Sequence, residues 1–196
     1  LVRDLMPDDG EVVGLLALMV LTDARRTARV SAAGELVPLA EQDRGMWDVA
    51  MVAEGHRLVR ERLASGVAPG RYQILAAINA VHTSARDVRD TDWSQIVALY
   101  DQLIRLDPSP IVALNRAIAV ADLDGPEVAL VAVDGLEDDL AGYHAYHATR
   151  ADLLRRSGRR QDSLVAYTRA IDLTGNPAEA AYLTRRRDQL GMDRPD

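Results

Sequence analysis

Apolar residues recur at i, i+3 and i+4 along most of the chain, which is the spacing of amphipathic α-helices. Ala, Leu, Arg and Glu, which favour helices, dominate, whereas β-branched and aromatic residues are sparse. The pattern therefore predicts an all-α fold. The expected helices lie near residues 8–27, 43–64, 70–85, 92–106, 110–122, 125–136, 142–157, 160–174 and 177–190. Between residues 29 and 39, apolar ends flank a small-residue turn, which predicts a short β-hairpin on the helical body.

Helix starts are marked by a side-chain oxygen followed three residues later by a carboxylate or amide, the pattern of a capping box. Pairs that fit include Asp8 with Glu11, Asp92 with Gln95, Asp124 with Glu127, and Asn176 with Glu179. Pro110 and Pro177 follow Ser109 and Asn176, at the first helical position where proline is tolerated. These two prolines mark the most clearly defined starts.

An internal repeat relates residues 99–106 to residues 166–173. Tyr100 and Tyr167 coincide at an offset of 67 residues, together with the Ile and Leu that follow, and so do Pro110 and Pro177. This offset is close to two periods of the tetratricopeptide (TPR) unit, which is about 34 residues long. The sequence therefore resembles a TPR array, in which each helix pair packs only on its neighbours.

The best copy of the TPR pattern lies near the C-terminus. Its small, apolar, turn and aromatic positions are Ala151, Leu154, Gly158, Tyr167 and Ala170, with Ser163 where the pattern usually has Ala. A middle copy offers Ala117, Val120, Ala129 and Val133. We expect TPR-like repeats over residues 66–196, ending in a capping helix, and a distinct N-terminal helical cap region over residues 1–65.

Composition narrows the function without naming it. The chain has no Cys and a net charge of −7, which excludes disulfides and thiolate chemistry and argues against direct nucleic-acid contact. The apolar run at residues 12–21 is about half a membrane span and is interrupted by Gly14, so it predicts a buried helix and no membrane contact. No export signal is seen, so we expect a cytoplasmic protein. The missing initiator Met suggests a piece of a longer chain.

No enzyme constellation is present, because the chain lacks Lys and Cys, a Gly-rich phosphate loop and a nucleophile-elbow Ser. We therefore predict a non-enzyme without a cofactor or a metal. His144 and His147 share a helix face with Asp152, but no recognised motif supplies a third ligand. Groove lining, or hydrogen bonding to backbone carbonyls, is the better interpretation of these histidines.

Two groups of polar residues are candidates for protein contact. The first follows the apolar helix near the N-terminus: Asp23, Arg25, Arg26, Arg29, Gln42, Asp43 and Arg44. Structural roles compete here, because cations offset a helix C-terminal dipole, Asp43 can cap a helix and Trp47 can pack. The second group would line the concave face that TPR arrays expose on their A helices: Gln73, Asn79, Asn115, Tyr143 and His147.

Longer blocks carry a resemblance to one family. They are residues 15–19, 23–29 and 41–44 with Trp47; residues 72–78, 91–100 and 109–117; and residues 142–154. These blocks resemble the C-terminal extension of a group of bacterial extracytoplasmic-function (ECF) RNA polymerase sigma factors, in which a TPR-like domain follows the promoter-binding regions. The resemblance implies a regulatory domain whose partners are the upstream sigma regions of the same protein and RNA polymerase. No part of the chain resembles the promoter-reading regions themselves.

Two other functions remain open at this point. One is a free-standing TPR adaptor that binds a peptide of another protein. The other is a small-ligand sensor that uses Tyr143, His144 and His147. No sequence pattern specifies an oligomeric state.

Overall fold

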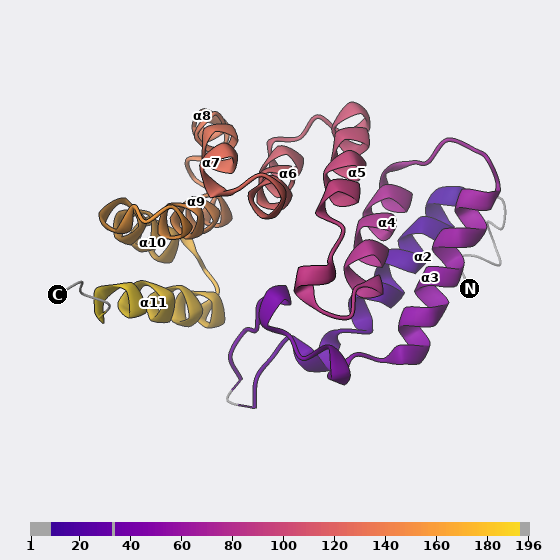
Figure 1. Cartoon of the computed structure of the whole chain (residues 1–196), viewed down its shortest axis with the longest axis horizontal. Coiled ribbons are helices and arrows are strands. Elements are labelled where there is room, and N and C mark those ends of the chain that lie inside the picture. The colour runs from indigo at the N-terminus through magenta and orange to yellow at the C-terminus, as the bar shows by residue number, and fades with distance from the viewer. Residues whose placement is uncertain (1–8, 33, 193–196) are drawn as a thin grey trace. The chain divides into compact units, whose positions relative to one another are not determined.

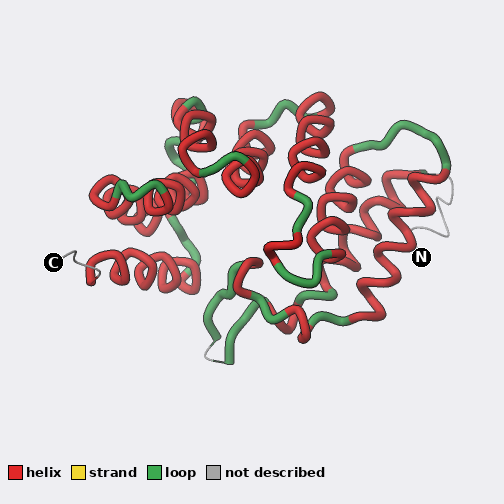
Figure 2. The backbone as a smooth tube through the Cα atoms, viewed as in Figure 1, coloured by secondary structure: helices red, strands yellow, loops and turns green. Residues whose placement is uncertain are grey.

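The structure, a computed structural model, describes residues 9–32 and 34–192 (Figure 1). Every regular element in these residues is a helix, which confirms the all-α prediction (Figure 2). The chain divides into two compact units. The N-terminal unit contains the described residues up to Ser31 and then Val37–Pro108, and the C-terminal unit contains the segment 32–36 and the described residues from Ser109 onward.

In its described residues, the N-terminal unit contains the α-helices α2 (Gly10–Asp23), α3 (Val49–Ala64), α4 (Arg71–Ser84) and α5 (Trp93–Leu106). Single 3₁₀ turns lie at Arg26–Ala28, Leu39–Glu41, Arg44–Met46 and Val88–Asp90. Helix α2 packs on α3 and α4, and α4 also packs on α5. Ala17, Leu58 and Ala76 form part of the core, so small residues again bring helices close together.

Two helical glycines allow these close approaches. A Cβ at Gly14 of α2 would lie 2.7 Å from the backbone nitrogen of Gln73 on α4. A Cβ at Gly55 of α3 would collide with the side chain of Leu21 on α2. The glycine that interrupts the apolar run at residues 12–21 is therefore the contact point between α2 and α4.

The second predicted helix starts later than the sequence pattern indicates. Helix α3 begins at Val49, where the Asp48 side chain accepts a hydrogen bond from the Met51 N–H (2.9 Å). Asp43 instead caps the short 3₁₀ turn, accepting from the Gly45 N–H (2.8 Å). A helix from residue 43 would have Gly45 in its first turn, whereas Asp48 supplies a second cap just before the apolar periodicity resumes. Trp47 between the two caps is buried.

The hairpin expected at residues 29–39 is reduced, in its described part, to an isolated bridge without strands. No strand of two or more residues occurs there, but Val30 and Leu36 each form an isolated β-bridge, and the Val37 N–H donates to the Arg29 carbonyl (2.9 Å). Gly34 has a φ of +79°, as the small-residue turn requires. The pairing does not extend into a ladder, and an isolated two-stranded hairpin has little stability of its own.

The C-terminal unit contains α6 (Pro110–Leu123), α7 (Pro126–Asp134), the short α8 (Glu137–Leu140), α9 (His144–Arg156), α10 (Arg160–Leu173) and α11 (Pro177–Met192). Helices α6 and α7 pair, α9 and α10 pair, α7 packs on α9, and α11 packs on α10. This is the stacking of successive helix pairs that the repeat predicts. Within this unit the structure is consistent with a helical-repeat array.

The capping predictions have mixed outcomes. Asp92 accepts from the Gln95 N–H (2.9 Å) and Asn176 from the Ala178 N–H (2.9 Å), as predicted. Asp8 lies outside the described residues. Asp124 does not cap α7, because the N-cap is Gly125, whose φ of +100° suits a residue without a Cβ.

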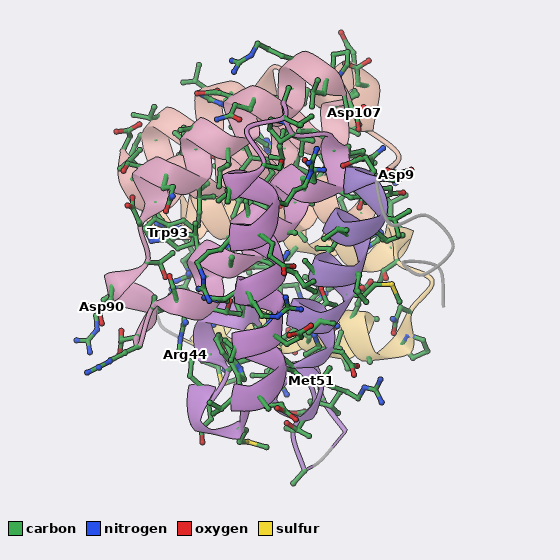
Figure 3. All side chains as sticks on the ribbon, turned by 90° about the vertical axis from the view of Figure 1, so that its right-hand side faces the viewer. Asp9, Arg44, Met51, Asp90, Trp93 and Asp107 are labelled. Carbon is green, nitrogen blue, oxygen red and sulfur yellow. The ribbon has the colours of Figure 1, made fainter. Side chains whose placement is uncertain are left out.

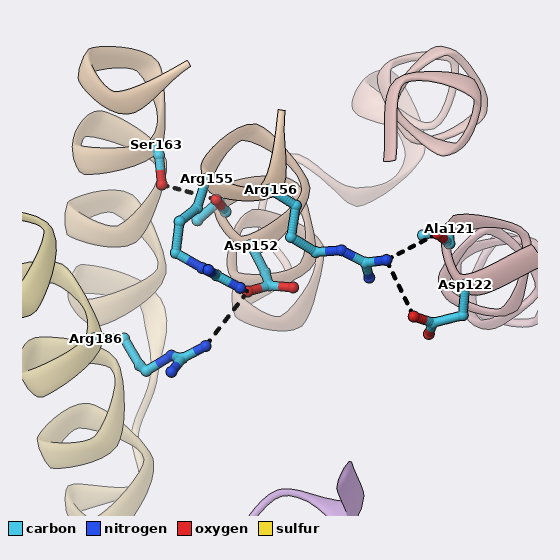
Figure 4. Close-up of polar contacts among 8 residues, drawn as sticks. Ala121, Asp122, Asp152, Arg155, Arg156, Ser163 and Arg186 are labelled. Atoms are coloured by element: carbon cyan, nitrogen blue, oxygen red, sulfur yellow. Dashed lines mark hydrogen bonds and ion pairs between the residues drawn. The ribbon is translucent and has the colours of Figure 1, made fainter. Parts of the chain in front are cut away.

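The repeat core explains the one unusual residue of the TPR-like pattern. Ala151, Leu154, Tyr167 and Ala170 are all almost fully buried between α9 and α10. Ser163 is also fully buried, and its hydroxyl donates to the Ala151 carbonyl across the helix pair (2.7 Å; Figure 4). Serine therefore fits a position that the pattern reserves for alanine, because its hydroxyl has an acceptor.

The division between the units differs from the boundary expected at residues 65 and 66. Helices α4 and α5 belong with α2 and α3, and the boundary lies between Pro108 and Ser109. The reason is the close packing of α4 on α2, which joins segments that are about 60 residues apart in sequence. No helix in the described part of the chain is long and apolar enough to cross a membrane.

Candidate functional site

Arg25 follows α2 and points into the N-terminal unit rather than away from it. Only 9% of its surface is exposed, and its guanidinium donates to the Asn79 side-chain oxygen on α4 (3.0 Å). Burial and, to a smaller extent, the charges of Arg29 and Arg44 together lower the pKa of Arg25 to about 10. Arg25 therefore stays cationic near neutral pH, and both Arg25 and Asn79 serve as an internal tie.

Arg44 ties the loop before α3 to the end of α4. Its guanidinium donates to the carbonyls of His82 (2.6 Å) and Ala85 (2.8 Å) and lies 4.6 Å from the ring centroid of Trp47. Carbonyls at a helix C-terminus lack helical partners and carry the negative end of the dipole, so a cation is stabilising there. Burial lowers the pKa of Arg44. Figure 3 shows Arg44 on the same side of this unit as Trp93.

His82 lies between these cations and α5. Its ring meets the Trp93 ring edge-on, with centroids 5.4 Å apart. Burial lowers the pKa of His82 to about 4, and the charges of Arg25 and Arg44 contribute in the same direction. The imidazole is therefore neutral at physiological pH.

Three charged members of the first candidate group remain at the surface. Arg26 donates to Asp23 (2.6 Å), with side-chain exposures of 78% and 40%. Asp43 is exposed at its 3₁₀ turn. This turn lies next to residues 26–28, because the Thr27 hydroxyl donates to the Met46 carbonyl (2.7 Å). We call Asp23, Arg26 and Asp43 the exposed charged edge.

The other two members of that group are partly buried. Gln42 donates to the Val37 carbonyl (3.1 Å), so it holds the loop together. Arg29 is partly buried, and its carbonyl accepts the Val37 N–H. The structure thus brings the seven residues into one region but gives most of them internal partners.

Gln73 is a helix-start residue rather than a groove residue on a concave repeat face. It is buried, and its side-chain oxygen accepts from the Gly70 N–H (3.1 Å). The carboxylate of Glu11 on α2 accepts from the N–H groups of Tyr72 (3.0 Å) and Gln73 (3.3 Å). Sequence reasoning missed this role of Glu11, although Gly70 before α4 was a signal, because glycine has no side chain with which to cap.

The remaining candidates lie in the C-terminal unit. Asn115 is exposed on α6, and Tyr143 precedes α9 with its ring edge-on to His144. His147 hydrogen-bonds the Ala141 carbonyl (2.8 Å), whereas His144 lies 3.1 Å from a Glu179 carboxylate oxygen. The two histidines therefore have separate partners. Among the described residues, no group of three or more His, Cys, Asp or Glu could hold a metal ion.

Charged side chains in this unit also connect successive helix pairs. Arg156 of α9 donates to the Ala121 carbonyl (2.8 Å) and to Asp122 (3.0 Å) on α6 (Figure 4). Asp152 accepts from Arg155 (2.7 Å) and lies 3.7 Å from Arg186 of α11. These ties join helices that the repeat stacks.

A groove that the sequence did not indicate lies in the N-terminal unit. Two hollows of about 150 and 270 Å³ adjoin there, and both are lined by Val59, Leu63, Ala77 and Leu99. Their walls come from α3 and α5 and their floor from α4, and Gly14 and Ala17 of α2 also line the first hollow. We call this the α3–α5 groove. Of its helices only α5 carries part of the repeat, at residues 99–106, and no sequence pattern pairs the exposed faces of the three helices.

Comparison with known proteins finds a family model and a relative whose names assign no function. Residues 1–64 match a family model described as a family of unknown function (DUF6596). The chain is also similar to an uncharacterized protein of Rhizobium meliloti (strain 1021), with 42% identity over 189 residues. That match covers 96% of this chain and 44% of the relative, so the chain spans less than half the length of the relative. No solved structure matches.

Proposed function

We propose that this chain is the regulatory, protein-interaction part of an ECF-type sigma factor. It would dock on the upstream sigma regions of the same protein and control their access to RNA polymerase in the cytoplasm, without catalysing a reaction. The blocks that resemble this family extend over both units, from residue 15 to residue 154. The match to a relative more than twice as long supports a role within a longer protein.

The observation that carries the proposal is the exposed charged edge on a fixed base. Asp23 and Arg26 are exposed, while the neighbouring Arg25 and Arg44 tie the same segments to α4. A preorganised surface loses little conformational entropy on binding, so exposed charges on such a base are suited to recognising a partner. The contacts of Arg25 and Arg44 with α4 also explain why these two residues are less exposed than their neighbours Asp43 and Arg26.

The upstream coding sequence provides the first test. Sigma regions encoded before Leu1 are expected. A native start near Leu1 with no sigma regions would overturn the proposal and favour the free-standing adaptor.

Run-off transcription with the full-length protein and core RNA polymerase provides the second test. Arg26→Glu is expected to change transcript yield about threefold or more, the effect of losing one exposed charge contact. Arg169→Glu, at an exposed position on α10, is the matched control and should leave the yield unchanged. Unchanged yield for Arg26→Glu, with unaltered circular dichroism, would rule out the exposed charged edge as the docking surface.

A further inference from the structure

The α3–α5 groove has the dimensions of a helix-binding site. Its floor follows one face of α4 from Gln73 through Ala77 and Ala80 to Ser84. These residues recur at i, i+3 and i+4, so they form a single stripe about 16 Å long at 1.5 Å per residue. A stripe of this length and its small side chains suit a helix of about three turns lying along α4.

The walls of the groove present apolar surface to solvent. Leu63 on α3 lines both hollows and is 67% exposed, and Val67 beyond the end of α3 is 62% exposed. Val59 lies one turn before Leu63 on the same face, and Leu99 of α5 lies opposite. Clustered apolar exposure of this kind marks binding surfaces more often than single exposed residues do.

The charges of the groove all have one sign. Arg60 and Arg62 line it, and among the described lining residues there is neither Asp nor Glu, in a chain with 30 acidic and 23 basic residues. The acidic residues of α3 are engaged elsewhere, because Glu54 and Glu61 pair with Arg57 on the opposite face. An occupant with carboxylates beside its apolar face would complement this groove.

Arg62 is fixed at one end of the groove by contacts with its neighbours. One of its terminal nitrogens donates to the Ser65 hydroxyl (2.6 Å), but its Nε is buried without a hydrogen-bond partner in the described part of the chain. Buried donors are rarely left unpaired, since each costs about 1–3 kcal/mol. This Nε lies against Gly10 of α2, so what Arg62 offers an occupant of the groove is the positive charge of its guanidinium.

We propose that the α3–α5 groove binds an amphipathic α-helix of a partner protein, with its apolar side chains on Leu63 and Leu99 and its flanking carboxylates on Arg60 and Arg62. This role is separate from the sigma-factor proposal, because it involves a different surface and would hold equally in a free-standing adaptor. A small ligand would need only one hollow, whereas the two hollows adjoin along the whole stripe on α4.

The test uses two fluorescent synthetic peptides with the purified chain. Both are about four turns long, with Leu at i, i+3, i+4 and i+7, and they differ only in Glu or Lys at the flanking positions. Fluorescence anisotropy should show saturable binding of the Glu peptide and at least about threefold weaker binding of the Lys peptide. Leu63→Asp should weaken binding of the Glu peptide about tenfold or more. Val131→Asp, at a 76% exposed position on α7, is the matched control and should not.

Charge reversal gives the sharpest outcome. Arg60 is exposed, so Arg60→Glu should leave folding intact and shift the preference from the Glu peptide toward the Lys peptide. Equal binding of the two peptides, or no binding of either, would overturn the proposal. So would a concentration-dependent dimer abolished by Leu63→Asp, which would identify a second copy as the occupant. Stoichiometric binding of anilinonaphthalene sulfonate that Leu63→Asp abolishes, without peptide binding, would identify a small amphipathic anion instead.

Discussion

The two units stabilise their helices in different ways. In the C-terminal unit, helix pairs stack through small and aromatic residues such as Ala151, Ala170 and Tyr167. In the N-terminal unit, polar side chains from loops and helix starts cross between segments far apart in the sequence, as Arg25 does to Asn79 and Arg44 to His82. Regular packing leaves a repeating signature in the sequence, whereas individual polar ties leave none.

The internal contacts of the N-terminal unit also determine which of its arginines are buried and which are exposed. Arginines are abundant in both units, and sequence alone treats those at positions 25, 26 and 44 as alike. The structure distinguishes them, because Arg25 is buried while its neighbour Arg26 is exposed. Candidate contact residues in a region without a repeat therefore have to be sorted by their internal partners.

Removing an aromatic ring from the repeat core should have the largest effect. Tyr167→Ala is expected to destabilise the C-terminal unit by about 3–5 kcal/mol, because Tyr167 is 2% exposed and its loss leaves a cavity between α9 and α10. Hydrogen exchange of the α9 and α10 amides measures this effect. Tyr167→Phe, which keeps the ring, is the control, and equal loss of protection in both variants would contradict the packing account.

Acidification should destabilise the N-terminal unit next most strongly. The pKa of His82 is about 4 in the folded chain and about 6.5 when unfolded, so the unfolded state binds more protons between these values. The free energy of unfolding should therefore fall by about 2–3 kcal/mol as pH drops from 6.5 to 4. Burial and Arg60 lower the pKa of His56 as well, which adds in the same direction.

Both tryptophans lie in the N-terminal unit, so urea unfolding followed by their fluorescence reports on this unit. His82→Gln should flatten the pH dependence over that window. An equally steep dependence in the variant would show that His82 is not its source.

Arg44→Ala is expected to cost about 2 kcal/mol in the same fluorescence assay. It leaves the carbonyls of His82 and Ala85 without this donor and removes the cation from the Trp47 face. Arg26→Ala is the matched control and should stay within about 0.5 kcal/mol of the wild type, because its ion pair is exposed. Similar losses of unfolding free energy in the two variants would show that Arg44 contributes no more to stability than the exposed Arg26.

Glu11→Gln should have the smallest effect of the series, about 1 kcal/mol. The amide keeps one acceptor oxygen for the Tyr72 and Gln73 N–H groups at the start of α4 but loses the negative charge that favours a helix N-terminus. Fluorescence-detected unfolding measures the loss. Glu61→Gln, whose exposed partner is Arg57, should change the unfolding free energy by less than about 0.5 kcal/mol. If the two changes were equal, Glu11 would not be the cap of α4.

The sequence predicted the C-terminal unit in more detail than the N-terminal unit for a physical reason. The periodic spacing of Ala151, Leu154, Tyr167 and Ala170 is itself the packing pattern, so reading the repeat also identified the buried residues. The start of α3 was harder to place, because Asp43 and Asp48 are both competent caps and only the tertiary fold selects the second for the helix.

The candidate site was predictable as a region but not in its details. The block at residues 23–29 and 41–44 does come together, yet which arginine is buried depends on Asn79 and His82, more than 35 residues away in the sequence. The α3–α5 groove was not predictable, since it arises from helices that individually resemble ordinary amphipathic helices.

The central claim is that polar contacts between segments far apart in the sequence add measurably to the core packing that stabilises the N-terminal unit. A double-mutant cycle between Arg25→Met and Asn79→Ala, with unfolding followed by tryptophan fluorescence, tests it most directly. Their side chains are joined by one hydrogen bond of 3.0 Å, so the account predicts a coupling energy of about 1–2 kcal/mol. Strictly additive losses, with no coupling beyond about 0.3 kcal/mol, would contradict it.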